Sequence, residues 1–116
     1  MRTTTTTGVK DLCCSPVLSA ELPEEESQDL AAALRVLADP VRLRIVSLIR
    51  AAPDGRTLTR DLVEQLAVAQ PTVSHHLGVL HDAGFLVRER RGRETWYATE
   101  PDAFAAISQL LAPRDS

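Results

Sequence analysis

The chain has 116 residues and a formal net charge of −3, and 44% of its residues are hydrophobic but only 3% are aromatic. This length fits one domain with an aliphatic core. No apolar run approaches the roughly 18–20 residues that cross a bilayer, and the first residues lack the apolar segment of a secretory signal. We therefore expect a cytoplasmic protein without a membrane span.

The charge is distributed unevenly along the chain. Residues 1–40 hold three basic and seven acidic residues, residues 41–99 hold nine arginines and six acidic residues, and residues 100–116 hold one arginine and three acidic residues. Screening confines the effect of a charge to about 10 Å, so DNA affinity depends on the local patch. The basic middle of the chain is therefore compatible with DNA binding despite the negative total.

The first 21 residues show no periodic apolar face. They contain five consecutive threonines, from Thr3 to Thr7, and Pro16. Such a composition buries too little apolar surface to order a chain. We therefore expect residues 1–21 to be a flexible tail and residues 22–116 to form the domain.

Two helices are predicted at the start of the domain. The first starts near Pro23, where three glutamates follow at once, and negative charge suits the beginning of a helix. Leucines spaced four and three apart give this helix one apolar face: Leu30, Leu34 and Leu37. Asp39 then suits an N-cap and Pro40 the first position of a second helix. That second helix is apolar on most sides, so we expect it to be central.

Two short helices are predicted after a turn at residues 53–55. The first spans Leu58 to Leu66, and the second begins at Pro71 and ends at Gly84. About three residues join them. Two short helices connected in this way predict a helix-turn-helix.

A hairpin and a last helix complete the predicted elements. The runs from Phe85 to Arg90 and from Glu94 to Thr99 are typical of strands, with a tight turn between them. Pro101 then opens a helix with one apolar face. Four helices, two strands and a helix predict a mainly α fold with a small β-hairpin, a winged helix-turn-helix. The terminal helices carry apolar faces that a small domain cannot cover, so we expect a homodimer that pairs through them.

The second helix of the helix-turn-helix carries polar side chains in its first turns. In this fold, that part of the helix reaches the major groove of DNA. Gln can pair with adenine, and Ser or Thr can contact several bases or a phosphate. The candidate DNA-binding residues of this helix are Gln70, Thr72, Ser74, His75 and His76.

The orientation of His76 stays open between the DNA and the domain interior. His75 and His76 point about 100° apart on a helix, so they cannot chelate one ion well. His81 is five residues from His76, which is also a poor spacing. We therefore do not expect a zinc site made of these histidines.

Arginines of the hairpin are the candidate phosphate contacts. Beside the second helix of the helix-turn-helix, the recognition helix, these arginines can contact phosphates or the minor groove of DNA. The alternative is that they form a charged turn exposed to solvent. The four candidates are Arg88, Arg90, Arg91 and Arg93, of which the last two flank the glycine at the tip. Trp96 and Tyr97 are expected to anchor the hairpin to the core.

Two segments of the chain resemble the ArsR/SmtB family of metal-responsive repressors. They are LADPVRLRIVSLI at residues 37–49 and QPTVSHHLGVLHDAGFLVRERRGRETWYA at residues 70–98, in this order and spacing. The resemblance covers about residues 30–111. It implies a dimeric repressor that binds double-stranded operator DNA with an inverted repeat and leaves it when an inducer binds. Many relatives have Ser or Thr in place of Ala69, so here Gln70 or water must cap the recognition helix.

Cys13 and Cys14 are the only cysteines of the chain. A vicinal disulfide is strained and rare in a reducing compartment, whereas thiolates are soft ligands. Some arsenical sensors of the resembled family carry such a pair in the N-terminal tail, with a third cysteine in the turn after the second helix. In this chain that turn holds Asp54, a hard carboxylate that suits trivalent arsenic poorly.

The resemblance therefore implies trivalent arsenic or antimony as the inducer, bound by Cys13 and Cys14, with Asp54 near the place of the third ligand. Another metal such as cadmium, zinc or nickel, a thiol redox switch, and an inert cysteine pair remain alternatives. Other sensor patterns of the family are missing. LTRDLVEQL holds no cysteine pair, and Asp102 is the only hard ligand of the last helix.

Enzyme activity is not expected. The sequence shows no nucleophile with a base, no phosphate-binding loop and no paired carboxylates, and it implies no organic cofactor. An arsenate reductase would need an anion-binding loop near its thiols, which CCSPVLSAELP does not offer. A protein-interaction module with a degenerate winged helix and a metal-independent regulator of the same fold are the other classes that the sequence allows.

Overall fold

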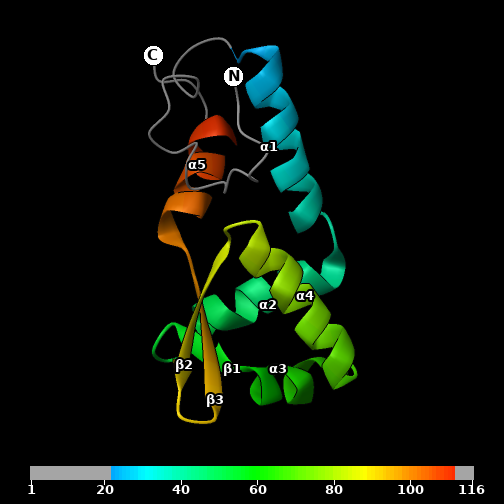
Figure 1. Ribbon diagram of the computed structural model, residues 1–116, viewed down its shortest axis with the longest axis vertical. Coiled ribbons are helices and arrows are strands. Elements are labelled where there is room, and N and C mark those ends of the chain that lie inside the picture. Colours follow the sequence, from blue (N-terminus) through cyan, green and yellow to red (C-terminus); the bar gives the residue numbers. More distant parts are fainter. Residues whose placement is uncertain (1–21, 112–116) are drawn as a thin grey trace.

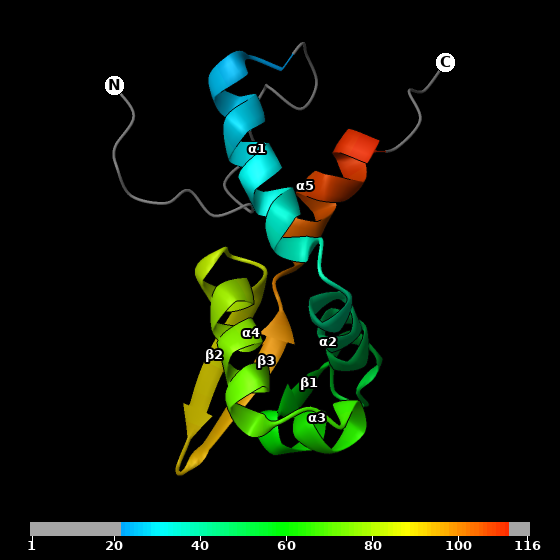
Figure 2. The ribbon, with the colours of Figure 1, turned by 90° about the vertical axis from the view of Figure 1, so that its right-hand side faces the viewer.

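The structure is a computed structural model that describes residues 22–111 (Figure 1). The predicted tail, residues 1–21, lies outside the described residues. α1 and α5 lie at one end of the molecule, and the tip of the β2–β3 hairpin lies at the other (Figures 1 and 2). The elements in chain order are α1 (Glu24–Leu37), α2 (Pro40–Ala51), β1 (Arg56–Leu58), α3 (Thr59–Leu66), α4 (Gln70–Asp82), β2 (Leu86–Arg91), β3 (Glu94–Thr99) and α5 (Pro101–Leu111).

Asp39 caps α2 as the sequence predicts. Its Oδ1 accepts hydrogen bonds from the backbone N–H groups of Val41, at 2.9 Å, and Arg42, at 3.1 Å. The bond from the Arg42 N–H is the main cause that lowers the pKa of Asp39 below its usual value, and the bond from Val41 lowers that pKa further. This carboxylate therefore fixes the point where α1 ends and α2 begins.

The sheet has three antiparallel strands where the sequence predicts two. Its order is β1-β3-β2, and β1 pairs with residues 96–98, in the half of β3 away from the hairpin tip. Thr57 of β1 lies opposite Tyr97 of β3, and both side chains are buried. Because β1 leads directly into α3, this pairing joins the base of the hairpin to the helix-turn-helix.

The helix-turn-helix is formed by α3 and α4. Ala67 ends α3 in a left-handed conformation, with φ of 56°, and Ala69 occupies the N-cap position of α4. No side chain caps α4, so Gln70 does not supply the cap that the sequence analysis considered. The backbone N–H groups of Thr72 and Val73 instead bond to the Ala69 carbonyl.

The core is aliphatic and is built around α2 and α4. The largest fully buried side chains are Phe85, Ile45, Ile49, Leu62, Leu77, Leu80 and Val73. Phe85, between α4 and β2, packs against Phe104 of α5, with 5.3 Å between the ring centroids. The predicted central position of α2 is thus confirmed. Of the two predicted anchors of the hairpin, Tyr97 is buried in the core, whereas Trp96 is only partly buried and lies outside the core cluster.

The described residues contain no helix that has both the length and the apolar character needed to cross a membrane.

Candidate nucleic-acid interface

The start of α4 and the tip of the hairpin share one open cleft of about 250 Å³. Gln70 and Ser74 line it from α4, and Arg93 lines it from the residues before β3. Thr59 and Arg60 of α3 and Glu94 and Thr95 of β3 also line it. The structure thus brings three of the predicted DNA-binding residues together, although they come from two separate parts of the chain.

The remaining polar residues at the start of α4 lie on its exposed side. Thr72 and His75 are exposed, while Val73 and Leu77 are fully buried and hold the opposite side of the helix against the core. Gln70 and Ser74 are exposed as well. The first turns of α4 therefore present a continuous polar face that can donate and accept hydrogen bonds.

His76 faces the interior of the domain. Its side chain is partly buried, and its Nδ1 accepts a hydrogen bond of 3.1 Å from Nε of Arg42 in α2. Of the two orientations that the sequence leaves open, toward DNA or toward the domain interior, this contact favours the interior. His76 is therefore not part of the exposed polar face of α4.

The hairpin arginines divide between two faces of the sheet. In the register of β2 and β3, Arg88 lies opposite Tyr97 and Arg90 opposite Thr95, and these four residues line a second open cleft of about 360 Å³. Arg90 also donates from Nε to the carbonyl of Gly92, at 3.1 Å. Since side chains alternate along a strand, Arg91 belongs to the other face.

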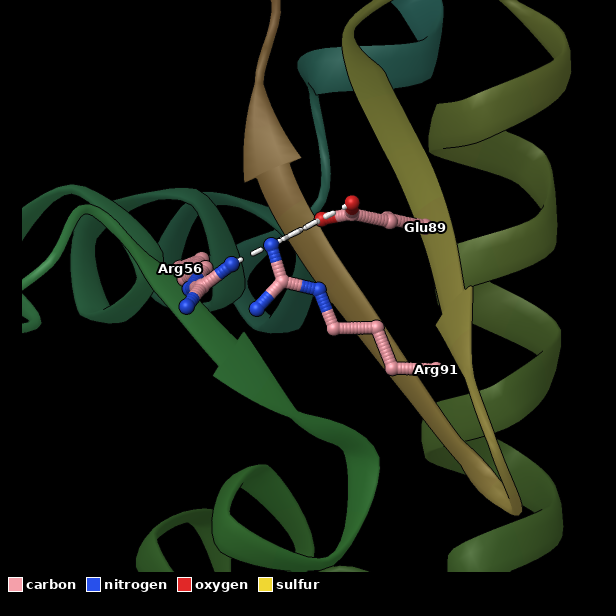
Figure 3. A network of polar contacts seen from close by, with 3 residues as sticks. All are labelled: Arg56, Glu89 and Arg91. Atoms are coloured by element: carbon pink, nitrogen blue, oxygen red, sulfur yellow. Dashed lines mark hydrogen bonds and ion pairs between the residues drawn. The ribbon is translucent and has the colours of Figure 1, made fainter.

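Arg91 is held by a carboxylate on that other face. Its Nη2 lies 3.2 Å from Oε1 of Glu89, and Nη1 of Arg56 in β1 lies 3.5 Å from the same oxygen (Figure 3). The Arg56 guanidinium also lies over the ring of Trp96, 4.9 Å from its centroid. Arg91, predicted as a contact at the tip, is thus directed across the sheet toward β1.

A second glutamate pairs with the arginine of the cleft. Nη2 of Arg60 lies 2.9 Å from Oε2 of Glu94. By contrast, the guanidinium groups of Arg88 and Arg93 have no ion pair or hydrogen bond within residues 22–111. Arg56 was not predicted here because β1, the strand that holds it, was not recognised from the sequence. Arg60, Glu89 and Glu94 lie in predicted elements, but their ion pairs depend on contacts between distant parts of the chain.

The candidate metal ligands are not assembled within the described residues. Asp54 is exposed in the turn after α2 and lines a groove of about 410 Å³ with Asp61, Gln65 and Trp96, among others. Within residues 22–111, no group of three His, Cys, Asp or Glu side chains could hold a metal ion. Cys13 and Cys14 lie outside the described residues.

The sequence profile of a helix-turn-helix domain family matches residues 37–89, from the end of α1 into β2. The chain is 40% identical over 82 residues to the HTH-type transcriptional repressor SmtB of Mycobacterium tuberculosis. That match covers 71% of this chain and 58% of SmtB, so the chain spans somewhat more than half the length of this relative.

Two further relatives are matched over more of their length. The chain is 30% identical over 96 residues to the biofilm growth-associated repressor of Xylella fastidiosa, and this match covers 82% of each chain. It is 32% identical over 84 residues to the arsenical resistance operon repressor of Staphylococcus xylosus. This match covers 72% of this chain and 78% of that repressor.

Solved structures agree with these matches. A possible transcriptional regulator for arsenical resistance superimposes with a TM-score of 0.57 at 29% identity, over 67% of this chain and 75% of that one. An ArsR family transcriptional regulator superimposes with a TM-score of 0.62 at 26% identity, over 71% of this chain and 81% of that one. The relatives are DNA-binding transcriptional regulators and not enzymes, as the sequence predicts. The chain belongs to the ArsR/SmtB family of helix-turn-helix transcriptional repressors.

Proposed function

We propose that the protein is a homodimeric repressor that binds an inverted repeat in operator DNA with the start of α4 and the hairpin of each subunit. The observation that carries the proposal is the cleft in which Gln70 and Ser74 of α4 lie with Arg93 of the hairpin. It joins side chains suited to base edges with a guanidinium suited to phosphate.

The two parts of this surface have different roles. Gln70, Thr72, Ser74 and His75 enter the major groove and read bases. Arginines of the hairpin, Arg88 and Arg93 first, contact the phosphate backbone beside that groove, because these two guanidinium groups have no competing partner within residues 22–111. Phosphate contacts fix the position of the helix, and base contacts supply the sequence preference.

The dimer forms through α1 and α5. Both helices lie at the end of the molecule away from the hairpin tip (Figure 2). Leu111 of α5 is 70% exposed, and Leu34 of α1 and Leu110 of α5 are only partly buried. A second copy would cover these apolar side chains, and a two-fold axis at this end would present two copies of α4 to two half-sites.

The inducer is a trivalent arsenic or antimony compound bound by Cys13 and Cys14. Soft thiolates suit these metalloids, and the relatives include a repressor named for arsenical resistance. The exposed carboxylate of Asp54 is a hard ligand, so the thiol pair must supply most of the binding. To release operator DNA, the inducer must bind the two conformations with free energies that differ by a few kcal/mol.

Operator binding with and without arsenite tests this proposal. A fluorescent duplex from the DNA upstream of the protein's own gene is titrated with the full chain, in a phosphine reductant because dithiols capture arsenite. Release of wild-type protein by arsenite, but not of the Cys13→Ser/Cys14→Ser variant, would support the thiol site. Equal release of both proteins would contradict that site, and failure of wild type to prefer this duplex over an unrelated one would contradict the repressor.

A further inference from the structure

Within residues 22–111, the hydrogen bonds of Arg42 connect α1, α2 and α4. Its Nε donates to Nδ1 of His76 in α4, at 3.1 Å, and its Nη1 donates to the carbonyl of Val36 in α1, at 3.0 Å. Its backbone N–H donates to Asp39, the N-cap of α2, at 3.1 Å. One residue in the first turn of α2 therefore contacts the end of α1 and the middle of the recognition helix.

The contact with α1 satisfies a group that the helix itself leaves without a partner. Val36 lies in the last turn of α1, where backbone carbonyls have no N–H group four residues further along the helix. A guanidinium is planar and rigid, so donors on its two sides hold their acceptors in a fixed relation. Through this group, the end of α1 and His76 of α4 are kept at a set distance and angle.

The contact with α4 also fixes which ring nitrogen of His76 accepts. Arginine only donates, so Nδ1 of His76 accepts and the ring N–H group is on Nε2. A side chain without an acceptor at this place would leave Nε of Arg42 without this partner, and α4 would lose its hydrogen bond to α2.

We propose that Arg42 is a positioning residue that sets the recognition helix against α1 and α2 through the acceptor nitrogen of His76, so that loss of this contact weakens operator binding. This inference rests on the proposed function. Because α1 lies in the proposed dimer interface, Arg42 also gives that interface a direct connection to α4.

The test compares His76→Asn with His76→Leu in operator titrations at pH 8. The Asn amide oxygen takes the place of Nδ1 and accepts from Arg42, whereas Leu offers no acceptor. We expect His76→Leu to bind operator about five-fold more weakly than wild type, the value of one lost hydrogen bond, and His76→Asn to bind within about two-fold of wild type.

One further variant separates positioning from folding. Arg42→Gln removes the guanidinium donor, and it should bind operator several-fold more weakly than His76→Asn at pH 8. Thermal unfolding by circular dichroism identifies a variant that fails to fold, in which case the other of His76→Leu and Arg42→Gln decides. Operator affinity of a folded His76→Leu or Arg42→Gln variant equal to that of wild type would overturn the inference, as would a loss in His76→Asn as large as that in His76→Leu. Absence of DNA binding by wild type at pH 8 would instead overturn the proposed function.

Discussion

The carboxylate of Glu89 serves two guanidinium groups, since its Oε1 lies 3.2 Å from Nη2 of Arg91 and 3.5 Å from Nη1 of Arg56 (Figure 3). A carboxylate in this position competes with DNA phosphate for Arg91. Because Arg56 remains beside Glu89, Arg91 can move to a phosphate without leaving the carboxylate unpaired. Under the proposed function, Arg91 would therefore become available to a phosphate when DNA binds.

Replacing Glu89 by Gln should strengthen binding to any duplex. Exposed ion pairs contribute at most about 1 kcal/mol, so we expect a gain of about two- to five-fold for operator and unrelated DNA alike. Titrations of both duplexes measure this gain. The matched control is Glu64→Gln, which removes the same charge from an exposed position of α3 and should give a smaller gain.

A double-mutant cycle shows whether the effect of Glu89 acts through Arg91. In an Arg91→Gln background, the gain from Glu89→Gln should shrink, because the competing guanidinium is absent. An equal gain in both backgrounds would mean that Glu89 only repels DNA through its charge, and the competition described above would be wrong.

Arg93→Gln should weaken binding without changing the sequence preference. Arg93 lines the cleft with Gln70 and Ser74 and has no ion pair within residues 22–111. If it contacts one phosphate, its removal should lower the slope of log affinity against log salt by about 1. Titrations at four salt concentrations give that slope, and an unchanged slope would place Arg93 away from the backbone.

Gln70→Ala should have the opposite signature. A side chain that pairs with a base contributes about 1–3 kcal/mol of discrimination, so the variant should lose about five- to 150-fold for operator DNA and little for an unrelated duplex. The salt slope should not change. A loss of equal size for both duplexes would show that Gln70 contacts the backbone and does not read a base.

Asp39→Ala should lower the midpoint of thermal unfolding, because the N–H groups of Val41 and Arg42 lose their acceptor. The pKa of Asp39 is lowered in the folded protein, so its stabilisation is present above the unfolded pKa and is lost as pH falls through the folded pKa. Asp39→Asn keeps a capping oxygen but does not titrate. Its stability should therefore fall less than that of wild type between pH 5 and pH 2, as followed by circular dichroism.

The long helices and the capping of α2 could be predicted from local pattern. The leucine spacing of α1, the Asp39-Pro40 pair and the apolar residues of α4 are features of contiguous sequence, and the structure confirms each of them. The hairpin was found for the same reason, with its first strand displaced by one residue to Leu86–Arg91. The candidate DNA-binding residues followed from these elements.

What the sequence could not predict depends on contacts between distant segments. β1 has three residues, too few to show an alternating pattern, and it is a strand because it pairs with β3. The direction of His76 depends on Arg42, which is 34 residues away. The different surroundings of Arg91 and Arg93 follow from the strand register and from Glu89.

An amide chemical-shift titration with operator duplex tests the central claim most directly, because it reports where DNA contacts the domain. The account predicts the largest shifts at residues 70–75 of α4 and at residues 88–93 of the hairpin, with the amides of α5 little affected. Shifts concentrated on α1 and α5, with α4 and the hairpin unchanged, would show that DNA binds a different surface and would contradict the account.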